Sequence, residues 1–198
     1  MTQIDFWYDF ASTYSYPSAM RIEALAATRD VAVNWRPFLL GPIFVEQGWK
    51  NSPFNIYPVK GRYMWRDMER ICARQKLAFR QPDPFPQNSM LAARLALALE
   101  PTLRPEFSRQ VYLAQFAKGL PISDRAALAP ILEGFGLHPS TMIEKAASEP
   151  VKQSLRMETD EAKRIGIFGA PSFVTEDGEL FWGNDRLEEA LGWAVDKR

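Results

Sequence analysis

Strand-like patterns occur only near the two ends of this chain, and helical patterns fill the long stretch between them. Residues 4–8 are aromatic and branched, as in a buried strand, and residues 31–38 begin with β-branched alternation. A helical pattern separates these two segments, which predicts a βαβ unit with a right-handed crossover. Near the C-terminus, two short strands joined by an Asp-Gly hairpin precede a helix over residues 185–196. This order predicts the α/β class, with a large helical block inserted into a small α/β unit.

The segment between the second strand and the helical block is rich in proline and glycine. Residues 39–58 contain these residues at a density that predicts a loop. A loop of this length is uncommon in a compact domain unless it has a function.

The turn after the first strand carries Ser12 and leads directly into a helix. Ser15 is a candidate N-cap, and Pro17 falls in the first turn, where its missing N–H does no harm. A strand-to-helix turn directs free amides and the positive end of the helix dipole towards whatever lies beside Ser12. The turn therefore favours a bound anion; the alternative is that Ser12 only shapes the turn.

Charge and residue counts argue against several classes of site. The 24 basic and 24 acidic residues include no basic tract, so we expect no nucleic-acid partner. No apolar run approaches the roughly 20 residues that cross a bilayer, and no signal peptide is visible, so we expect a cytoplasmic protein without a membrane span. With only Cys72 and His138, a disulfide within the chain is impossible, and neither a zinc site nor a Ser-His-Asp triad is expected. The helical periodicity around Cys72 predicts a buried structural thiol rather than a reactive one.

Four motifs spread along the whole chain resemble those of a known family. They are Phe6-Trp7-Tyr8-Asp9-Phe10-Ala11-Ser12-Thr13-Tyr14-Ser15-Tyr16, Lys60-Gly61-Arg62-Tyr63-Met64, Gly166-Ile167-Phe168-Gly169-Ala170-Pro171-Ser172-Phe173 and Trp182-Gly183-Asn184-Asp185-Arg186. In this order they resemble the kappa-class glutathione transferases and, within that group, the bacterial 2-hydroxychromene-2-carboxylate isomerases. The resemblance implies a thioredoxin-like glutathione-binding domain formed by residues 1–50 and 157–198, with residues 51–156 as an all-helical insertion.

The resemblance also implies how the serine turn is used. Thioredoxin-type disulfide enzymes carry Cys-x-x-Cys where this chain has Ser12-Thr13-Tyr14-Ser15, so disulfide exchange by the protein itself is excluded. Ser12 matches the family's serine, although Thr13 stands where the family usually has proline. Pro171 matches a cis-proline that lies against this turn, and a cis peptide is accessible before proline. Glutathione would lie across Ser12 and Pro171, with its cysteinyl backbone paired to the main chain of Ala170 as an added strand.

Four further residues match positions that contact glutathione in the family. Asn184 and Asp185 match the residues that hold the γ-glutamyl end, where a carboxylate suits the ammonium group and helix amides suit the carboxylate. Asn51 and Lys60 match other contacts. Taken alone, Asn51 also suits a loop-shaping asparagine and Lys60 a solvated lysine.

The reaction implied by the resemblance interconverts 2-hydroxychromene-2-carboxylate and trans-o-hydroxybenzylidenepyruvate. Addition of the glutathione thiolate makes a double bond transiently single, so that it can rotate, and Ser12 would orient and stabilise that thiolate. Aromatic side chains available to line a slot for the flat acid are Trp7, Tyr8, Phe44, Trp49, Tyr63, Trp65 and Trp182. Candidates to meet its carboxylate are Arg36, Arg62 and Lys60.

Two other functions remain open at this point. One is a kappa-type transferase or peroxidase that acts on other electrophiles. The other is a non-enzymatic member of the fold that binds glutathione or a protein. By resemblance alone, a homodimer is expected in each case.

Overall fold

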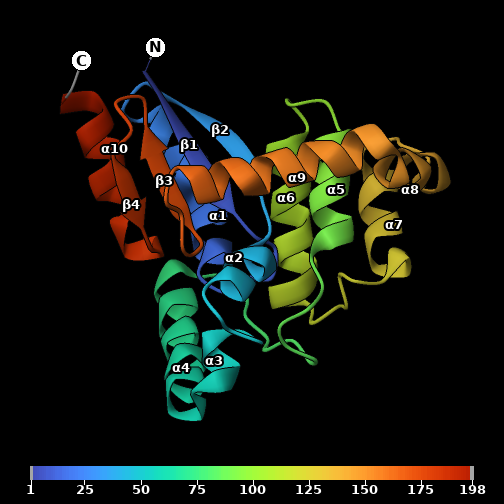
Figure 1. Ribbon diagram of the computed structural model, residues 1–198, viewed down its shortest axis with the longest axis horizontal. Coiled ribbons are helices and arrows are strands. Elements are labelled where there is room, and N and C mark those ends of the chain that lie inside the picture. Colours follow the sequence, from blue (N-terminus) through green and yellow to red (C-terminus); the bar gives the residue numbers. More distant parts are fainter. Residues whose placement is uncertain (1, 197–198) are drawn as a thin grey trace.

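The central sheet combines strands from the two ends of the chain. In the computed structural model, which describes residues 2–196, the strands lie in the order β2-β1-β3-β4 (Figure 1). They are β1 (Thr2–Tyr8), β2 (Val31–Pro37), β3 (Ser172–Thr175) and β4 (Leu180–Trp182). β1 pairs parallel with β2 and antiparallel with β3, and β3 pairs antiparallel with β4. Trp7 pairs with Ser172, so the end of β1 lies beside the start of β3. The predicted strand-helix-strand and strand-strand-helix halves are confirmed.

Both faces of β1 are buried, because its side chains alternate between two cores. Ile4, Phe6 and Tyr8 belong to the larger core, while Trp7 packs in the smaller one with Phe38. Three helices that contact the sheet are α1 (Ser15–Ala27), α10 (Leu187–Asp196) and α9 (Glu149–Arg164), and α2 (Leu40–Glu46) contributes Ile43 to the smaller core. In Figure 1, α9 crosses in front of the sheet and α1 lies behind it. The sheet is thus held between helices, and the aromatic opening of the chain forms its centre.

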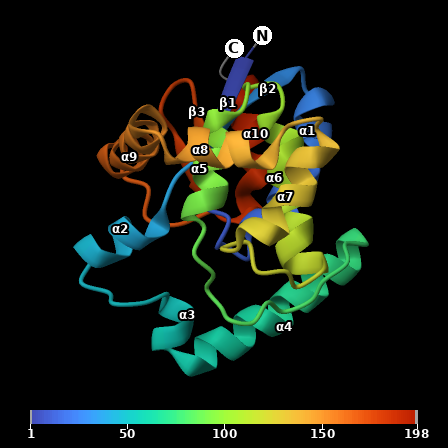
Figure 2. The same ribbon diagram turned by 90° about the vertical axis from the view of Figure 1, so that its right-hand side faces the viewer.

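The helices between β2 and β3 form two groups. They are α3 (Pro53–Ile56), α4 (Pro58–Gln75), α5 (Met90–Ala98), α6 (Arg104–Tyr112), the π-helix η1 (Leu113–Ala117), α7 (Arg125–Gly134) and α8 (Pro139–Ala147). α5 to α8 pack together, whereas α3 and α4 lie to one side (Figure 2). α9 leads from the α5–α8 group back to the sheet. α9 also crosses the domain boundary predicted at 156/157, and the division into 1–50, 51–156 and 157–198 stays a prediction.

The proline-rich segment 39–58 is not one continuous loop, as its composition had predicted. It contains the helices α2 and α3. Pro42 lies in the first turn of α2 and Pro53 at the start of α3, where a proline costs no intrahelical hydrogen bond. The prediction is wrong because proline content marks helix starts as well as loops. Among residues 2–196, no helix is both long enough and apolar enough to span a membrane.

Candidate active site

Ser12 lies in the turn that joins the buried strand β1 to α1. Its hydroxyl donates to the main-chain carbonyl of Ala170 at 2.8 Å and accepts from the amide of Ser15 at 3.3 Å. Ser15 is therefore not the N-cap that the sequence predicted: it is the first residue of α1, and its amide is satisfied by Ser12. The turn itself is closed by a hydrogen bond from the Ser12 amide to the Asp9 carbonyl at 2.9 Å. One hydroxyl thus ties the start of α1 to a loop that lies 158 residues away in the sequence.

That loop contains the Ala170–Pro171 peptide bond, which is cis. Ala170 faces a cavity, while Pro171 is buried behind it. The Pro171 carbonyl accepts from the amide of Gly183 at 2.9 Å, so the loop is also fixed to the end of β4. Ser12, Ala170 and the segment after β4 therefore form one connected unit.

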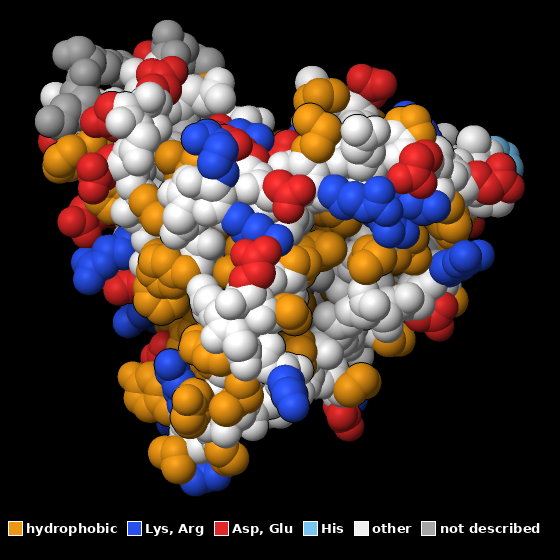
Figure 3. All heavy atoms as spheres, viewed as in Figure 1, with side chains coloured by type: hydrophobic (Ala, Val, Ile, Leu, Met, Phe, Trp, Pro, Cys, Tyr) orange, Lys and Arg blue, Asp and Glu red, His pale blue; other side chains and the backbone are white. Residues whose placement is uncertain are grey.

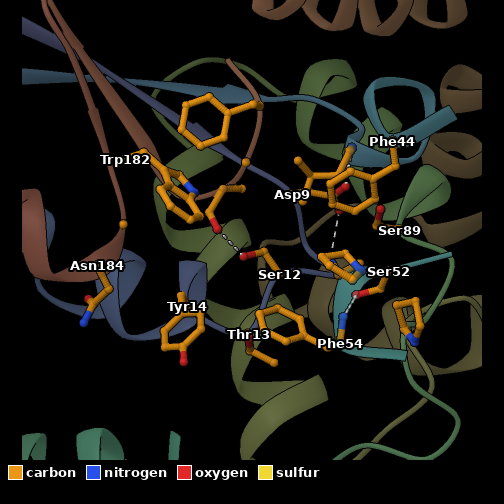
Figure 4. A pocket seen from close by; sticks show the side chains of 18 of the residues that line it. Asp9, Ser12, Thr13, Tyr14, Phe44, Ser52, Phe54, Ser89, Trp182 and Asn184 are labelled. Carbon is orange, nitrogen blue, oxygen red and sulfur yellow. Dashed lines mark hydrogen bonds between the residues drawn. The ribbon is translucent and has the colours of Figure 1, made fainter. Parts of the chain in front are cut away.

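The cavity at this turn has a volume of about 1550 Å³. Six of the seven site residues predicted from the sequence line it: Ser12, Asn51, Lys60, Ala170, Asn184 and Asp185. The seventh, Pro171, is the buried one. Figure 4 shows Trp182 and Asn184 on one side of Ser12, and Asp9, Phe44 and Ser89 on the other.

Asn184 and Asp185 play different structural parts. Asn184 is 7% exposed, and its Oδ1 accepts from Ser18 Oγ at 2.9 Å and from Arg21 Nη2 at 3.2 Å. The Asp185 side chain is exposed and lies at the mouth of the cavity. Gly183 precedes them with φ +113°, and a Cβ there would lie 2.6 Å from Asp185 Oδ1. Only glycine allows this sharp approach to the 3-10 turn η2 (Asn184–Arg186).

Arg21 adds a cation to this side of the cavity. Its guanidinium contacts Glu188 and donates to the Asn184 carbonyl at 2.5 Å. Its Nε is buried and, among the described residues, has no hydrogen-bond partner. A buried donor without a partner is costly, whereas the rest of the Arg21 side chain lines the cavity and brings a positive charge to it.

Asp9 and Ser89 are two buried polar residues of the cavity wall that sequence reasoning missed. Asp9 is 3% exposed, and its carboxylate accepts from the amides of Ala11 at 2.9 Å and Leu40 at 2.8 Å. Burial raises the pKa of Asp9 above its ordinary value, although the hydrogen bonds from these amides oppose the shift. The sequence does contain one sign that Asp9 has a special role, because this charged residue stands between two aromatic residues, Tyr8 and Phe10, that are buried. Nothing in the sequence links Asp9 to Ser89.

Four of the seven aromatic candidates line the cavity: Phe44, Trp49, Tyr63 and Trp182. Phe54 and Phe85, which the sequence did not single out, line it as well. Of the other three, Trp7 and Tyr8 are buried in the cores, and Trp65 is partly buried against the larger core. The indole of Trp182 lies so close to Gly169 that a Cβ at this glycine would stand 2.3 Å from Nε1.

Of the three basic residues that were candidates to bind the substrate carboxylate, one lines the cavity and two do not. Arg36 forms ion pairs with Asp5 at 3.0 Å and Glu158 at 2.9 Å, away from the cavity. Arg62 does not line the cavity either, so Lys60 is the candidate that does. Side chains of a strand point alternately to its two faces. Arg36 points to the face that α9 covers, so it links β2 to Glu158 of α9 instead of facing the cavity.

Cys72 and His138 do not contribute to the cavity. Cys72 is 1% exposed on α4, and burial raises the pKa of its thiol to about 11, so the predicted structural role is confirmed. His138 is exposed at the start of α8. Within residues 2–196, no cluster of His, Cys, Asp and Glu side chains is arranged to hold a metal ion. The lining residues therefore offer hydroxyls, amides, carboxyls and the cationic groups of Lys and Arg, and no thiol or imidazole.

Comparison with known proteins identifies the family. The model of the DSBA-like thioredoxin domain matches residues 3–192, nearly the whole chain. The chain belongs to this family. A 2-hydroxychromene-2-carboxylate isomerase from Sphingobium xenophagum is 27% identical over 194 residues, covering 98% of each chain. Glutathione S-transferase kappa 1 from Homo sapiens is 25% identical over 199 residues, covering 93% of this chain and 87% of its own.

A solved structure supports the same relationship at the level of the fold. The structure of a 2-hydroxychromene-2-carboxylate isomerase matches with a TM-score of 0.88 at 22% identity, covering 98% of this chain and 97% of its own. The thioredoxin-like fold with helices inserted between its halves is confirmed, as is the resemblance indicated by the four motifs. This DSBA-like protein is related to isomerases and glutathione transferases.

Proposed function

We propose that this protein is a glutathione-dependent isomerase that interconverts 2-hydroxychromene-2-carboxylate and trans-o-hydroxybenzylidenepyruvate. The observation that carries the proposal is the hydrogen bond of 2.8 Å from Ser12 Oγ to the Ala170 carbonyl, beside the cis peptide and inside the cavity. The similarity to the Sphingobium isomerase over 98% of both chains supports the reaction class.

The residues of the cavity fit glutathione. Ligand pockets usually enclose about 300–1,000 Å³, and this one is larger, so a tripeptide and an aromatic acid have room side by side. The positive charge of Arg21 and the carboxylate of Asp185, two residues that line the cavity, suit the charged γ-glutamyl end. Ala170 would hold the cysteinyl backbone, and Asn51 and Lys60 would contact other parts of the tripeptide. When bound, glutathione supplies a thiolate that adds reversibly to a conjugated double bond and so allows the bond to rotate.

The chain's own part is to favour the charged form of that sulfur. The Ser12 hydroxyl donates to the Ala170 carbonyl, and a ligand amide that donates to the same carbonyl would release the Ser12 proton towards the cavity. The first amides of α1 lack partners inside the helix and add the positive end of its dipole. A free thiol has a pKa of about 8.5, and each of these interactions lowers it.

The test is a Ser12→Ala variant assayed with the chromene acid, with and without glutathione. A hydrogen bond to a charged group contributes about 1.5–3 kcal/mol, so the rate with glutathione should fall by roughly 10- to 100-fold. Ser154→Ala serves as control, because Ser154 is an exposed serine of α9 whose hydroxyl donates to the Pro150 carbonyl of the same helix at 3.0 Å. Isomerisation that persists undiminished in Ser12→Ala, or without glutathione, would contradict the proposal.

A second candidate is a kappa-type glutathione transferase or peroxidase. The nearly equal identity to the human kappa-class transferase, 25%, favours it. Conjugation of glutathione to an aryl halide, or reduction of a hydroperoxide, in the absence of chromene isomerisation would select this candidate. If calorimetry shows glutathione binding without any of these activities, the protein is a non-catalytic glutathione-binding member of the fold.

We also propose that the protein is a cytoplasmic homodimer. Exposed apolar side chains gather over α3 and α4 (Figure 3) and include Tyr57, Val59 and Tyr63, exposed by 55%, 71% and 61%. Contiguous exposed apolar surface is typical of protein–protein interfaces. Sedimentation equilibrium should give twice the mass of the chain, and Val59→Glu should reduce it to the monomer mass.

A further inference from the structure

We propose that Asp9 is a positioning residue: by capping α2 from the serine turn, it holds the aromatic side of the cavity at a fixed place relative to Ser12. The inference rests on the proposed isomerase function for its substrate class, a flat aromatic acid, and adds the residue that would align this substrate with the sulfur. The evidence is a set of hydrogen bonds that join Asp9 to its own turn, to α2 and to α6.

The first turn of α2 is capped by a residue from another segment. The residue before the helix is Leu39, whose side chain has no group that can accept a hydrogen bond. Asp9 takes the place of a local cap, because its Oδ2 accepts from the amide of Leu40 at 2.8 Å. The first amides of a helix have no partner inside it, and this bond satisfies one of them. The cap and the helix start are 31 residues apart in the sequence.

The same residue shapes the serine turn. Asp9 Oδ1 accepts from the amide of Ala11 at 2.9 Å, and the Asp9 carbonyl accepts from the amide of Ser12 at 2.9 Å. The carbonyl also accepts from the hydroxyl of Tyr112 at 3.0 Å. Asp9 is 3% exposed, so little water can replace these bonds. Ser12 and the start of α2 are therefore attached to one buried residue.

Two aromatic residues depend on the position of α2. Phe44 follows Leu40 by one helical turn on the same face, and both line the cavity. Trp49 also lines it, and its amide donates to the Phe44 carbonyl at 2.8 Å, with the two rings 5.5 Å apart. We call Phe44 and Trp49 the aromatic wall. Figure 4 shows Phe44 and Asp9 on the same side of Ser12.

Other bonds attach α2 to α9 instead of to the serine turn. The amide of Leu39 donates to Thr159 Oγ1 at 3.2 Å, and Glu46 at the end of α2 forms an ion pair with Lys163 at 2.6 Å. These contacts should keep α2 folded when the bond to Asp9 is lost. The expected effect of that loss is therefore a shift of the aromatic wall relative to the serine turn.

Such a shift would affect the reaction through alignment. A thiolate adds to a double bond only when the two reacting atoms lie close together, and a displacement of about 1 Å can lower the rate by about 100-fold. In the proposed reaction, Ser12 holds the sulfur and the aromatic wall holds the ring of the substrate. Asp9 then sets the distance between them without touching the reacting atoms.

Two variants of Leu40 test this role. Leu40→Pro removes the amide hydrogen that Asp9 accepts, at a helix position that tolerates proline, after a residue that is already extended with φ −115° and ψ 123°. Leu40→Ala also loses the leucine side chain but keeps the amide, so it is the matched comparison. Calorimetry without glutathione measures the binding of trans-benzylidenepyruvate, a flat aromatic keto acid. Leu40→Pro should bind this probe about 10-fold more weakly than Leu40→Ala.

An Asp9→Ala background shows whether Asp9 causes the difference. With the acceptor removed, Leu40→Pro and Leu40→Ala should bind the probe equally. In the presence of Asp9, with glutathione and the chromene acid, kcat should be roughly 10- to 100-fold lower in Leu40→Pro than in Leu40→Ala. Their affinities for glutathione should be equal, whereas a general loss of structure would weaken both ligands.

The outcomes separate this inference from the proposed function. Equal binding of the probe by the two Leu40 variants, or no binding by the wild type, overturns the inference. A difference that persists in the Asp9→Ala background also overturns it, and if that background does not fold, the two single variants still decide. A wild type that binds the probe, with the expected difference between the variants, but does not bind glutathione overturns the proposed isomerase and leaves the positioning role of Asp9 standing.

Discussion

Replacing Asn184 by alanine should destabilise the protein by an amount that follows from its hydrogen bonds. The Asn184 Oδ1 accepts from Ser18 Oγ at 2.9 Å and from Arg21 Nη2 at 3.2 Å. Arg21 keeps the Asn184 carbonyl and Glu188 as partners, whereas Ser18, which is fully buried, keeps only a bond of 3.3 Å to the Tyr14 carbonyl within α1. Weakening a buried hydrogen bond in this way costs about 1–3 kcal/mol. For a chain of this length, each kcal/mol lowers Tm by roughly 2–4 °C.

A double-mutant cycle measured by urea unfolding isolates the contact. Ser18→Ala removes the donor that Asn184→Ala leaves behind, so the double variant should cost less than the two single variants together. The expected coupling is about 1 kcal/mol. Additive single effects, or a Tm within 1–2 °C of wild type for Asn184→Ala, would show that Asn184 does not fix the site to α1.

Three further predictions concern single positions. Cys72, buried and with a thiol pKa of about 11, should resist a thiol reagent in the native state and react fully in denaturant; rapid native modification would contradict its burial. Because burial raises the folded-state pKa of Asp9, its contribution to the free energy of unfolding should be fully present below about pH 3.9 and be lost as the pH rises through the folded pKa, whereas Asp9→Asn should lack this slope. Equal pH slopes in the two proteins would refute this. Gly169→Ala places a Cβ 2.3 Å from Trp182 Nε1 and should cost about 1–3 kcal/mol, while Gly192→Ala, with no atom within 4 Å, should be neutral or stabilising; equal stabilities would contradict the close approach.

The sequence predicted the elements whose residues follow a strict period. Apolar periodicity predicts the strands 4–8 and 31–38, the helical block and the burial of Cys72. The spacing of apolar residues within each element is enough to show which face is buried. Segment 39–58 was misread because proline is favoured in the first turn of a helix as well as in loops.

The polar half of the site could not be predicted in the same way. Asp9 and Ser89 line the same cavity only after the helical block has folded back on the serine turn, and the sequence carries no sign of that arrangement. Arg36 illustrates the converse: its charge suggested a ligand, but its place on β2 commits it to Asp5 and Glu158. Contacts between distant segments depend on packing, which a single sequence does not specify residue by residue.

The central claim is that the serine turn lowers the pKa of a bound thiol. The direct measurement is a titration of glutathione bound to the protein, followed by the ultraviolet absorbance of the thiolate, in the wild type and in Ser12→Ala. The account predicts a bound pKa below the free value of about 8.5, and a return towards that value in Ser12→Ala. A bound thiol that titrates like free glutathione in the wild type would contradict it.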